Sequence, residues 1–390
     1  MICSDIFFNT YKRPPQAVAF TPYRVCPLGA HVDHQLARIT GFAIDKGIHI
    51  AYGPKENGVV EISSMQFEGR AQWHVNSVSP VPVGDWADHL RGATLALNAR
   101  YPLRRGICAV VSGELPIGGL SSSAAVIITF LSALSKINGI LLSETEMIEL
   151  AQDAENKYVG VSCGKLDQCC EVYCKKDKLL YMDLKTDEYK LLSAPDTMKP
   201  YKIAIFFSGV ERSLAGSKYN ARVDEAKAAA YALLAHAGMD YGKFADAHLT
   251  DVPRAVFDTY GHLLPETWRK RATHFFTECE RVERGADAWR RGDIEEFGRL
   301  VFESGKSSIE QWETGSPELI ALYNIMLETP GIYGGRFSGA GFKGCCMAII
   351  DPDYEQSIIE NIKSKYIKQF PNLEERFSAH ICITADGVKL

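Results

Sequence analysis

Hydrophobic and polar positions along the chain follow two periods, which predicts a mixture of strands and helices. Short apolar runs indicate strands at residues 15–25, 39–52, 59–62, 107–111, 179–183, 203–207, 346–350 and 379–384. Apolar residues three or four positions apart indicate helices at 85–100, 124–138, 145–158 and 220–237, and three more between 266 and 329. Because strands come before and between helices without regular alternation, the predicted fold class is α+β.

A polar connection at residues 187–199 interrupts this pattern, and two prolines, Pro195 and Pro200, flank its end. A chain of 390 residues is more often two domains than one. We therefore expect an N-terminal lobe over residues 1–195 and a C-terminal lobe over residues 196–390.

Composition narrows the class of protein. The formal net charge of −5 argues against nucleic acid as the main partner, although a pocket on an acidic protein can still be locally positive. The first residues lack the basic and apolar segments of a signal peptide, and no apolar run is long enough to span a membrane. Eleven cysteines cannot all pair, and their spacing does not match a zinc site. We expect a cytoplasmic protein with reduced cysteines.

The most distinctive stretch is residues 113–126, which read GELPIGGLSSSAAV and lead directly into the apolar helix. Glycines let the backbone approach an anion, and the first N–H groups of a helix have no partners within it. The stretch is therefore a candidate phosphate cradle, although it lacks the lysine of a Walker A loop. Taken alone, an ordinary loop with a good N-cap explains it slightly better.

Three further stretches are rich in polar groups or glycine. Residues 26–35 (CPLGAHVDHQ) follow the first predicted strand, residues 163–168 read CGKLDQ, and residues 334–344 read GGRFSGAGFKG. Taken alone, Asp167 is explained by a helix cap and Glu155 by a solvated helix position.

Residues 24–35, 114–125, 163–168 and 336–344, in this order, resemble the GHMP kinases and, within them, the galactokinase branch. The resemblance extends to residues 213–215 and 219–220 and so covers nearly the whole chain. It implies an N-terminal lobe like domain 2 of ribosomal protein S5, an α+β C-terminal lobe, and an active site between them.

The resemblance also implies roles for individual residues. Asp167 matches the catalytic aspartate and Arg24 the arginine that pairs with it, while Ser123 and Glu155 match the Mg²⁺ ligands. The positions that match sugar contacts are Ala30, His31, Asp33, Gly164 and Tyr219. The positions expected to hold the phosphates of ATP or to close over them are Gly118, Gly119, Leu120, Ser121, Ser122, Ser123, Gly339 and Gly341.

These residue types suit phosphoryl transfer, in which positioning and charge neutralisation carry most of the catalysis. A carboxylate at Asp167 can accept the proton of the attacking hydroxyl, and Arg24 can keep that carboxylate ionised. A carboxylate and a hydroxyl, Glu155 and Ser123, suit Mg²⁺ together with phosphate oxygens. Asp33 and His31 can form the directional hydrogen bonds that a sugar requires.

Four departures from the galactokinase pattern stand out. Ala30 replaces a glutamate that contacts the C6 end of the sugar in the family, and the surrounding loop resembles the galacturonokinase variant. Lys218 stands where galactokinases commonly carry an acid. The loop Pro116–Leu120 is one residue shorter than usual, and Lys343 replaces a glycine. A C6 carboxylate next to glutamate would be repelled by roughly 1 to 4 kcal/mol, a penalty that alanine removes.

The expected function is the ATP-dependent phosphorylation of the C1 hydroxyl of a hexuronic acid, D-galacturonate, with a small sugar acid and ATP as binding partners and Mg²⁺ as cofactor. The alternatives are a galactokinase and a non-catalytic sugar sensor. The intact set Arg24, Asp167, Glu155 and Ser123 argues against the sensor. No oligomeric state follows from the sequence.

Overall fold

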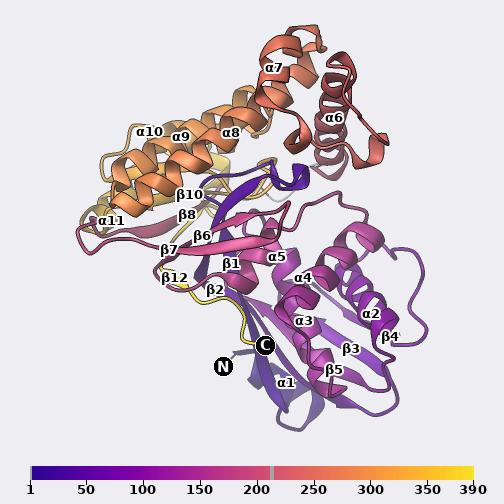
Figure 1. Ribbon diagram of the computed structural model, residues 1–390. Helices are drawn as coiled ribbons and strands as arrows, with labels where there is room; N and C mark the ends of the chain where they lie inside the picture. Colours follow the sequence, from indigo (N-terminus) through magenta and orange to yellow (C-terminus); the bar gives the residue numbers. More distant parts are fainter. Residues whose placement is uncertain (1, 211–214) are drawn as a thin grey trace.

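The computed structural model of the protein describes residues 2–210 and 215–390 and contains two antiparallel-rich sheets (Figure 1). Ser213 and Leu214, which contribute to the family resemblance, lie outside the described residues, as does the side chain of Lys218. The mixed content of helices and strands confirms the α+β class.

The first sheet has the order β4-β3-β5-β2-β6-β7, and β1 and β12 also pair with β2. The bounds of its strands are β1 (Ala17–Val25), β2 (Arg38–Lys55), β3 (Val59–Ser64), β4 (Arg70–His74), β5 (Gly106–Gly113), β6 (Lys178–Asp183), β7 (Glu188–Ser193) and β12 (Thr384–Ala385). The 18-residue strand β2 organises this sheet, because its first part pairs with β6 and its last part with β5.

The second sheet has the order β11-β8-β10-β9, with β8 (Lys202–Phe207), β9 (Ile332–Phe337), β10 (Cys345–Ile350) and β11 (Ser378–Cys382). Side chains on a strand alternate between its two faces. Ile203, Ile205 and Phe207 accordingly join the large core that continues from the first sheet. Ala204 and Phe206 belong to a separate core under α10 and α11. The second sheet is therefore apolar on both faces.

The helices gather in two groups, which Figure 1 shows on different sides of the molecule. The first group and the N-terminal helix are α1 (Ile2–Tyr11), α2 (Asp88–Arg100), α3 (Ser122–Ile137), α4 (Glu144–Asp153) and α5 (Leu166–Tyr173). The second group is α6 (Ala215–His236), α7 (Arg254–Tyr260), α8 (Glu266–Arg291), α9 (Ile294–Glu310), α10 (Pro317–Leu327) and α11 (Glu355–Gln369). The three helices predicted between residues 266 and 329 are confirmed as α8, α9 and α10.

Two sequence expectations need correction. The polar connection predicted at residues 187–199 contains β7, whose residues Glu188, Tyr189 and Lys190 are exposed while Leu192 is buried. An exposed edge strand held by its hairpin partner β6 is polar enough to be mistaken for a loop. The helix predicted at 145–158 is α-helical only to Asp153 and continues as a π-helix over Ala154–Val159.

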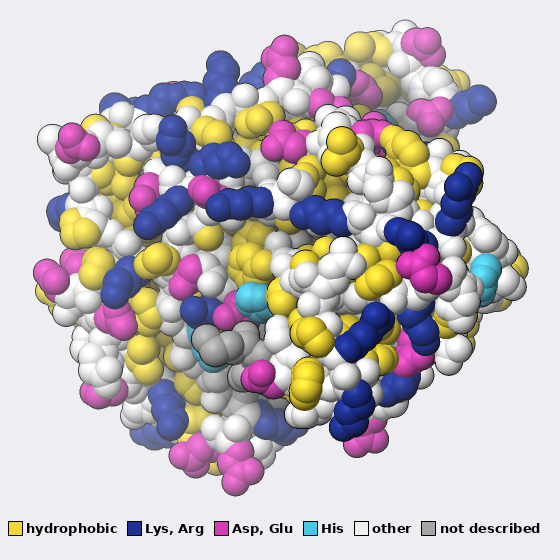
Figure 2. Space-filling view, turned by 90° about the horizontal axis from the view of Figure 1, so that it is seen from below, with side chains coloured by type: hydrophobic (Ala, Val, Ile, Leu, Met, Phe, Trp, Pro, Cys, Tyr) yellow, Lys and Arg dark blue, Asp and Glu magenta, His cyan; other side chains and the backbone are white. Residues whose placement is uncertain are grey.

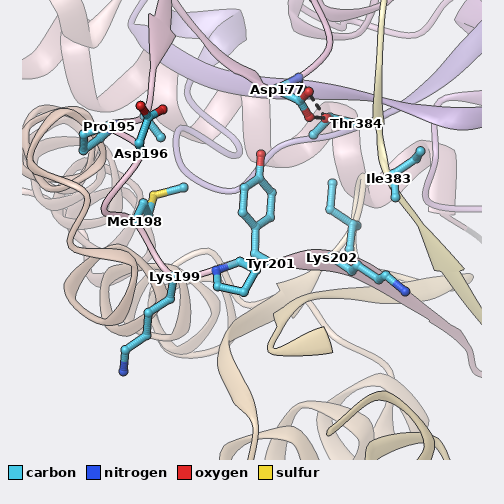
Figure 3. Close-up of a pocket in the computed structure, with 12 residues that line it drawn as sticks. Asp177, Pro195, Asp196, Met198, Lys199, Tyr201, Lys202, Ile383 and Thr384 are labelled. Carbon is cyan, nitrogen blue, oxygen red and sulfur yellow. Dashed lines mark hydrogen bonds between the residues drawn. The ribbon is translucent and has the colours of Figure 1, made fainter. Parts of the chain in front are cut away.

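The chain passes between the two sheets at the link after β7 and again before β12. These crossings enclose a pocket of about 330 Å³, into which Tyr201 projects (Figure 3). Thr384 also lines this pocket and is held by two hydrogen bonds to Asp177. Its hydroxyl donates to Asp177 Oδ1 at 2.9 Å and accepts from the Asp177 N–H at 2.9 Å. The proposed lobe boundary at 195/196 falls in the first crossing and stays a proposal. Of the described strands after it, β12 returns to the first sheet.

The surface carries charges of both signs. On the face shown in Figure 2, Lys and Arg side chains are interspersed with Asp and Glu, in keeping with the net charge of −5. In the described part of the chain, no helix combines the length and the apolar character needed to cross a membrane. All eleven cysteines are free thiols, and most are buried.

Candidate active site

A cleft of about 470 Å³ brings together loops that are far apart in the sequence. We name three of them: the His/Asp loop (residues 26–35), the Gly/Ser loop (residues 116–123) and the second glycine loop (residues 338–344). The sequence-predicted site residues that line the cleft are Arg24, Ala30, His31, Asp33, Gly118, Gly119, Ser121, Ser122, Ser123, Glu155, Asp167, Tyr219 and Gly339.

Three predicted site residues do not line it. The side chain of Leu120 is buried in the core. Its carbonyl oxygen accepts from the backbone N–H of Arg24, with the nitrogen and oxygen 3.4 Å apart. Gly164 lies behind Asp33, and Gly341 packs against Thr314. These three residues therefore shape the loops that border the cleft.

Asp167 and Arg24 form an ion pair at the centre of the cleft. Asp167 lies in the first turn of α5, where the helix dipole favours a negative charge, and its Oδ1 accepts from Arg24 Nε at 2.8 Å. Burial alone would lower the pKa of Arg24, but the Asp167 carboxylate outweighs it and the net shift is upward. Arg24 also donates to the Gly119 carbonyl at 3.0 Å, so one buried side chain links α5 to the Gly/Ser loop.

Glu155 is a buried carboxyl group in the π-helical segment that follows α4. The wider π turn changes the direction in which its side chain projects, as such turns often do at functional sites. Gln168 Nε2 donates to Glu155 Oε2 at 2.6 Å, and Ser123 lies beside the same carboxyl group. Burial, followed by the charge of Asp167, raises the pKa of Glu155 to about 7. A carboxyl group in this position would be stabilised as an anion by a bound cation.

The His/Asp loop presents polar side chains from a tightly packed backbone. Asp33 is 8% exposed, and burial, followed by the charge of Asp167, raises its pKa to about 6. A Cβ on Gly164 would lie 2.5 Å from Asp33 Oδ2, so a larger residue there would displace the carboxyl group. His31 stacks on Trp312 with ring centroids 5.3 Å apart, and burial lowers its pKa well below the usual value.

The Gly/Ser loop and the second glycine loop pack backbone against backbone. A Cβ on Gly118 would lie 3.0 Å from Gly344 Cα, and one on Gly119 would lie 2.7 Å from Cys345 Sγ. Both glycines have positive φ, at 127° and 90°, a region that favours glycine. The Ser338 hydroxyl donates to the Gly119 carbonyl at 2.7 Å and joins the two loops.

The start of α3 provides the features of an anion site. Its N-cap residue, Ser121, has a left-handed backbone and forms no capping hydrogen bond, and its buried hydroxyl has no partner in the described chain. Ser121, Ser122 and Ser123 all line the cleft. Unpaired N–H groups at a helix start next to two glycines fit the phosphates of a nucleotide.

The residues also fit Mg²⁺. Among the described residues, no group of three or more His, Cys, Asp or Glu side chains is arranged to hold a metal. The Glu155 carboxyl group and the Ser123 hydroxyl lie beside each other and offer two oxygen atoms, which leaves further positions for phosphate oxygens and water. Such a site is ordinary for Mg²⁺ bound together with a nucleotide.

Sequence reasoning missed the residues that support the site from outside. Gln168 orients Glu155, and Trp312 forms the surface on which His31 stacks. His274 and Glu278 of α8 contact the backbone of the His/Asp loop. The one available signal was a His and a Glu four positions apart in a predicted helix, which does not by itself identify a partner.

Comparison with known proteins agrees with this geometry. Two family models match: "GHMP kinases N terminal domain" over residues 88–175 and "GHMP kinases C terminal" over residues 286–368. A galacturonokinase of Arabidopsis thaliana is 38% identical over 96% of this chain and 93% of its own length. A galactokinase of Limosilactobacillus reuteri is 31% identical over 92% of each chain.

Solved structures extend the likeness to the whole fold. The crystal structure of Lactococcus lactis galactokinase complexed with galactose matches with a TM-score of 0.89 at 25% identity, and the match covers 99% of this chain and 98% of that one. The mevalonate kinase of Methanococcus jannaschii, at 14% identity and a TM-score of 0.63, shares the fold. The chain therefore belongs to the GHMP kinase family, in its galactokinase branch.

Proposed function

We propose that the protein transfers the γ-phosphoryl group of ATP to the C1 hydroxyl of a hexuronic acid, D-galacturonate, forming galacturonate 1-phosphate. The observation that carries the proposal is Ala30, whose small apolar side chain lines the cleft between the other residues of the His/Asp loop. The similarity to a galacturonokinase at 38% identity, against 31% for a galactokinase, supports the same substrate.

Asp167 is the proposed base. As the C1 oxygen bonds to the γ-phosphorus, its proton passes to the Asp167 carboxylate, and the bond from the γ-phosphorus to the oxygen bridging it to the β-phosphate breaks to release ADP. Arg24, whose Nε donates to Asp167 Oδ1 at 2.8 Å, orients that carboxylate and places a positive charge beside the moving phosphoryl group.

The nucleotide phosphates are proposed to bind the Gly/Ser loop, the start of α3 and the second glycine loop. Glu155 and Ser123 would hold Mg²⁺, which when bound neutralises phosphate charge. Lys343 also lines the cleft and adds a positive charge on this side.

The sugar is proposed to bind the His/Asp loop and Tyr219, while Gly164 lies behind Asp33 and shapes that loop. His31 Nε2 is buried and has no partner in the described chain, so it is available to a sugar hydroxyl. Asp33 supplies carboxylate oxygens from the same loop. A glutamate in place of Ala30 would repel a C6 carboxylate by roughly 1 to 4 kcal/mol, depending on local screening.

The test is ADP release by the purified protein with ATP and Mg²⁺, comparing galacturonate, glucuronate, galactose and N-acetylgalactosamine. The proposal expects galacturonate to have by far the highest kcat/KM. A preference for galactose would make the protein a galactokinase and Ala30 a neutral change. Binding of a sugar without turnover would support the sensor alternative, and Asp167→Asn provides the background rate.

A further inference from the structure

One face of α8 holds the backbone of the His/Asp loop. The Gly29 N–H donates to Glu278 Oε1 at 2.7 Å, and His274 Nε2 lies 3.0 Å from the Ala30 carbonyl oxygen. His274 and Glu278 are four positions apart, so they project from the same side of the helix. Both side chains are fully buried. Two consecutive residues of the loop are therefore held by one helix that lies more than 240 residues away in the sequence.

The hydrogen bonds of His274 define its tautomer. A carbonyl oxygen can only accept, so His274 Nε2 must carry the hydrogen. The other ring nitrogen, Nδ1, then accepts from the Ser307 hydroxyl of α9 at 2.8 Å. Burial lowers the pKa of His274 to about 4, which keeps the ring neutral near neutral pH. Ser307 thus fixes His274 as a donor to the loop.

Glu278 holds the Gly29 N–H as a charged acceptor. Burial would raise its pKa, but the nearby charges, led by Arg281, reverse this effect and the pKa falls to about 2. Arg281 Nε donates to Glu278 Oε2 at 2.8 Å, and the Ser304 hydroxyl donates to Oε1 at 2.6 Å. Hydrogen bonds to a charged partner are stronger than neutral ones, so this contact fixes the loop firmly.

The Trp312 ring packs against His31 of the same loop. The ring lies nearly parallel to His31, and the Trp312 carbonyl accepts from Arg222 Nε at 3.1 Å. Arg271 lies above the Trp312 ring, 5.9 Å from its centroid. The side chains that determine where Ala30 and His31 lie thus come from α6, α8 and the segment after α9.

We infer that His274 and Glu278, with Ser307 as their support, are positioning residues that set sugar affinity by fixing the Gly29–Ala30 backbone. The inference rests on the proposed function in one respect: the His/Asp loop is taken to contact the sugar. It does not depend on which sugar is preferred, because the contacts act on the backbone.

The test is His274→Ala, studied by calorimetric titration with the sugar that the wild type phosphorylates fastest and, separately, with Mg²⁺ and a non-hydrolysable ATP analogue. We expect the sugar dissociation constant to rise about ten-fold or more, because the Ala30 carbonyl loses its buried donor. We expect the nucleotide dissociation constant to change by less than about two-fold, since the hydrogen bonds of His274 go to the His/Asp loop and to α9.

Two further variants separate positioning from general destabilisation. His274→Gln retains an N–H that can reach Ala30 and should restore most of the sugar affinity. Thr94→Val removes a buried hydroxyl that accepts from Trp73 Nε1 at 3.1 Å, and it should lower the unfolding temperature without changing sugar affinity. If His274→Ala does not fold, Ser307→Ala should weaken sugar binding by about three-fold, because the tautomer is no longer fixed.

Unchanged sugar affinity in folded His274→Ala, or in Ser307→Ala if that variant must replace it, would overturn the inference. Equal losses of sugar and nucleotide affinity would also overturn it. Failure of the proposed function looks different, because it would appear in the wild type as a preference for galactose over galacturonate. A wild type that bound no sugar would overturn both.

Discussion

The two sides of the cleft differ in whether backbone or side-chain groups form their surface. The side proposed for the nucleotide is mostly backbone: Gly118 and Gly119 lie against Gly344 and Cys345, and neither glycine leaves room for a Cβ. The side proposed for the sugar is mostly side chains, such as Asp33 and His31, whose positions depend on neighbours. Phosphates need many similar donors, which backbone supplies, whereas sugar hydroxyls need a few specific partners.

The two sides also differ in how readily their specificity can change. The backbone cradle is fixed by local glycines and by the hydrogen bond from Arg24 to the Gly119 carbonyl, so we expect few substitutions to alter its specificity. On the side proposed for the sugar, we expect one position, Ala30, to set the preference at C6, while His274 of α8 holds the loop backbone.

The largest effect is expected at Asp167, where the two sides meet. Asp167→Asn keeps an acceptor for Arg24 but removes the proposed base, so kcat should fall about a thousand-fold. Sugar and nucleotide dissociation constants should change little, since neither loop loses its support. ADP release and calorimetric titration measure the two quantities. A rate within about ten-fold of the wild type would remove Asp167 from the role of base.

A smaller, selective effect is expected at Ala30. Ala30→Glu should lower kcat/KM for galacturonate about ten-fold more than for galactose, because a carboxylate then faces the C6 carboxylate. Ala30→Gln has nearly the same size without the charge and serves as the matched control. Equal losses on both sugars, or equal effects of Glu and Gln, would show that size rather than charge acts at this position.

The smallest expected effect is on the pH dependence of stability and concerns Glu171, which lies on α5 one turn after Asp167. It is fully buried, neither carboxyl oxygen has a partner in the described chain, and burial, followed by the charge of Asp167, raises its pKa well above the usual value. The folded state therefore holds a proton that the unfolded state has released. Stability must fall as pH rises from the ordinary glutamate pKa towards the raised one.

Glu171→Gln removes this titration, so its gain in stability over the wild type should be larger at about pH 8 than at about pH 6. Thermal unfolding at both pH values measures the difference. Asp33 and Glu155 titrate in both proteins, so the comparison isolates Glu171. A stability difference that does not grow with pH would contradict a buried, protonated carboxyl group.

The sequence allowed more to be predicted for the side proposed for the nucleotide than for the side proposed for the sugar. The glycines and serines of residues 113–126 are consecutive, and their backbone chemistry is local, so the sequence alone indicates a candidate phosphate cradle. Arg24, Asp167 and Glu155 could be placed by their order along the chain, which matches the family. The 2.8 Å ion pair of Arg24 with Asp167 and the raised pKa of Glu155 arise only when the chain folds.

The supports of the sugar side could not be predicted. His274 and Ala30 are 244 positions apart, and no local pattern links a helix residue to a distant carbonyl. The π turn at Ala154–Val159 was also missed, because its apolar stripe continues that of α4 and one extra residue per turn leaves little trace in the sequence. The strand β7 was missed because its outward face is exposed.

The most direct test of the comparison is a set of four calorimetric titrations, in which Gly119→Ala and Gly164→Ala each receive the sugar and the Mg²⁺-loaded ATP analogue. In Gly119→Ala the new Cβ meets Cys345 Sγ at 2.7 Å, and in Gly164→Ala it meets Asp33 Oδ2 at 2.5 Å. Gly139→Ala, with φ at 68° and open space around it, controls for backbone strain.

We expect a crossed result: Gly119→Ala loses nucleotide affinity and keeps sugar affinity, whereas Gly164→Ala loses sugar affinity and keeps nucleotide affinity. If each variant lost both ligands to the same extent, the two sides of the cleft would form one unit, and the division into a backbone side and a side-chain side would be wrong.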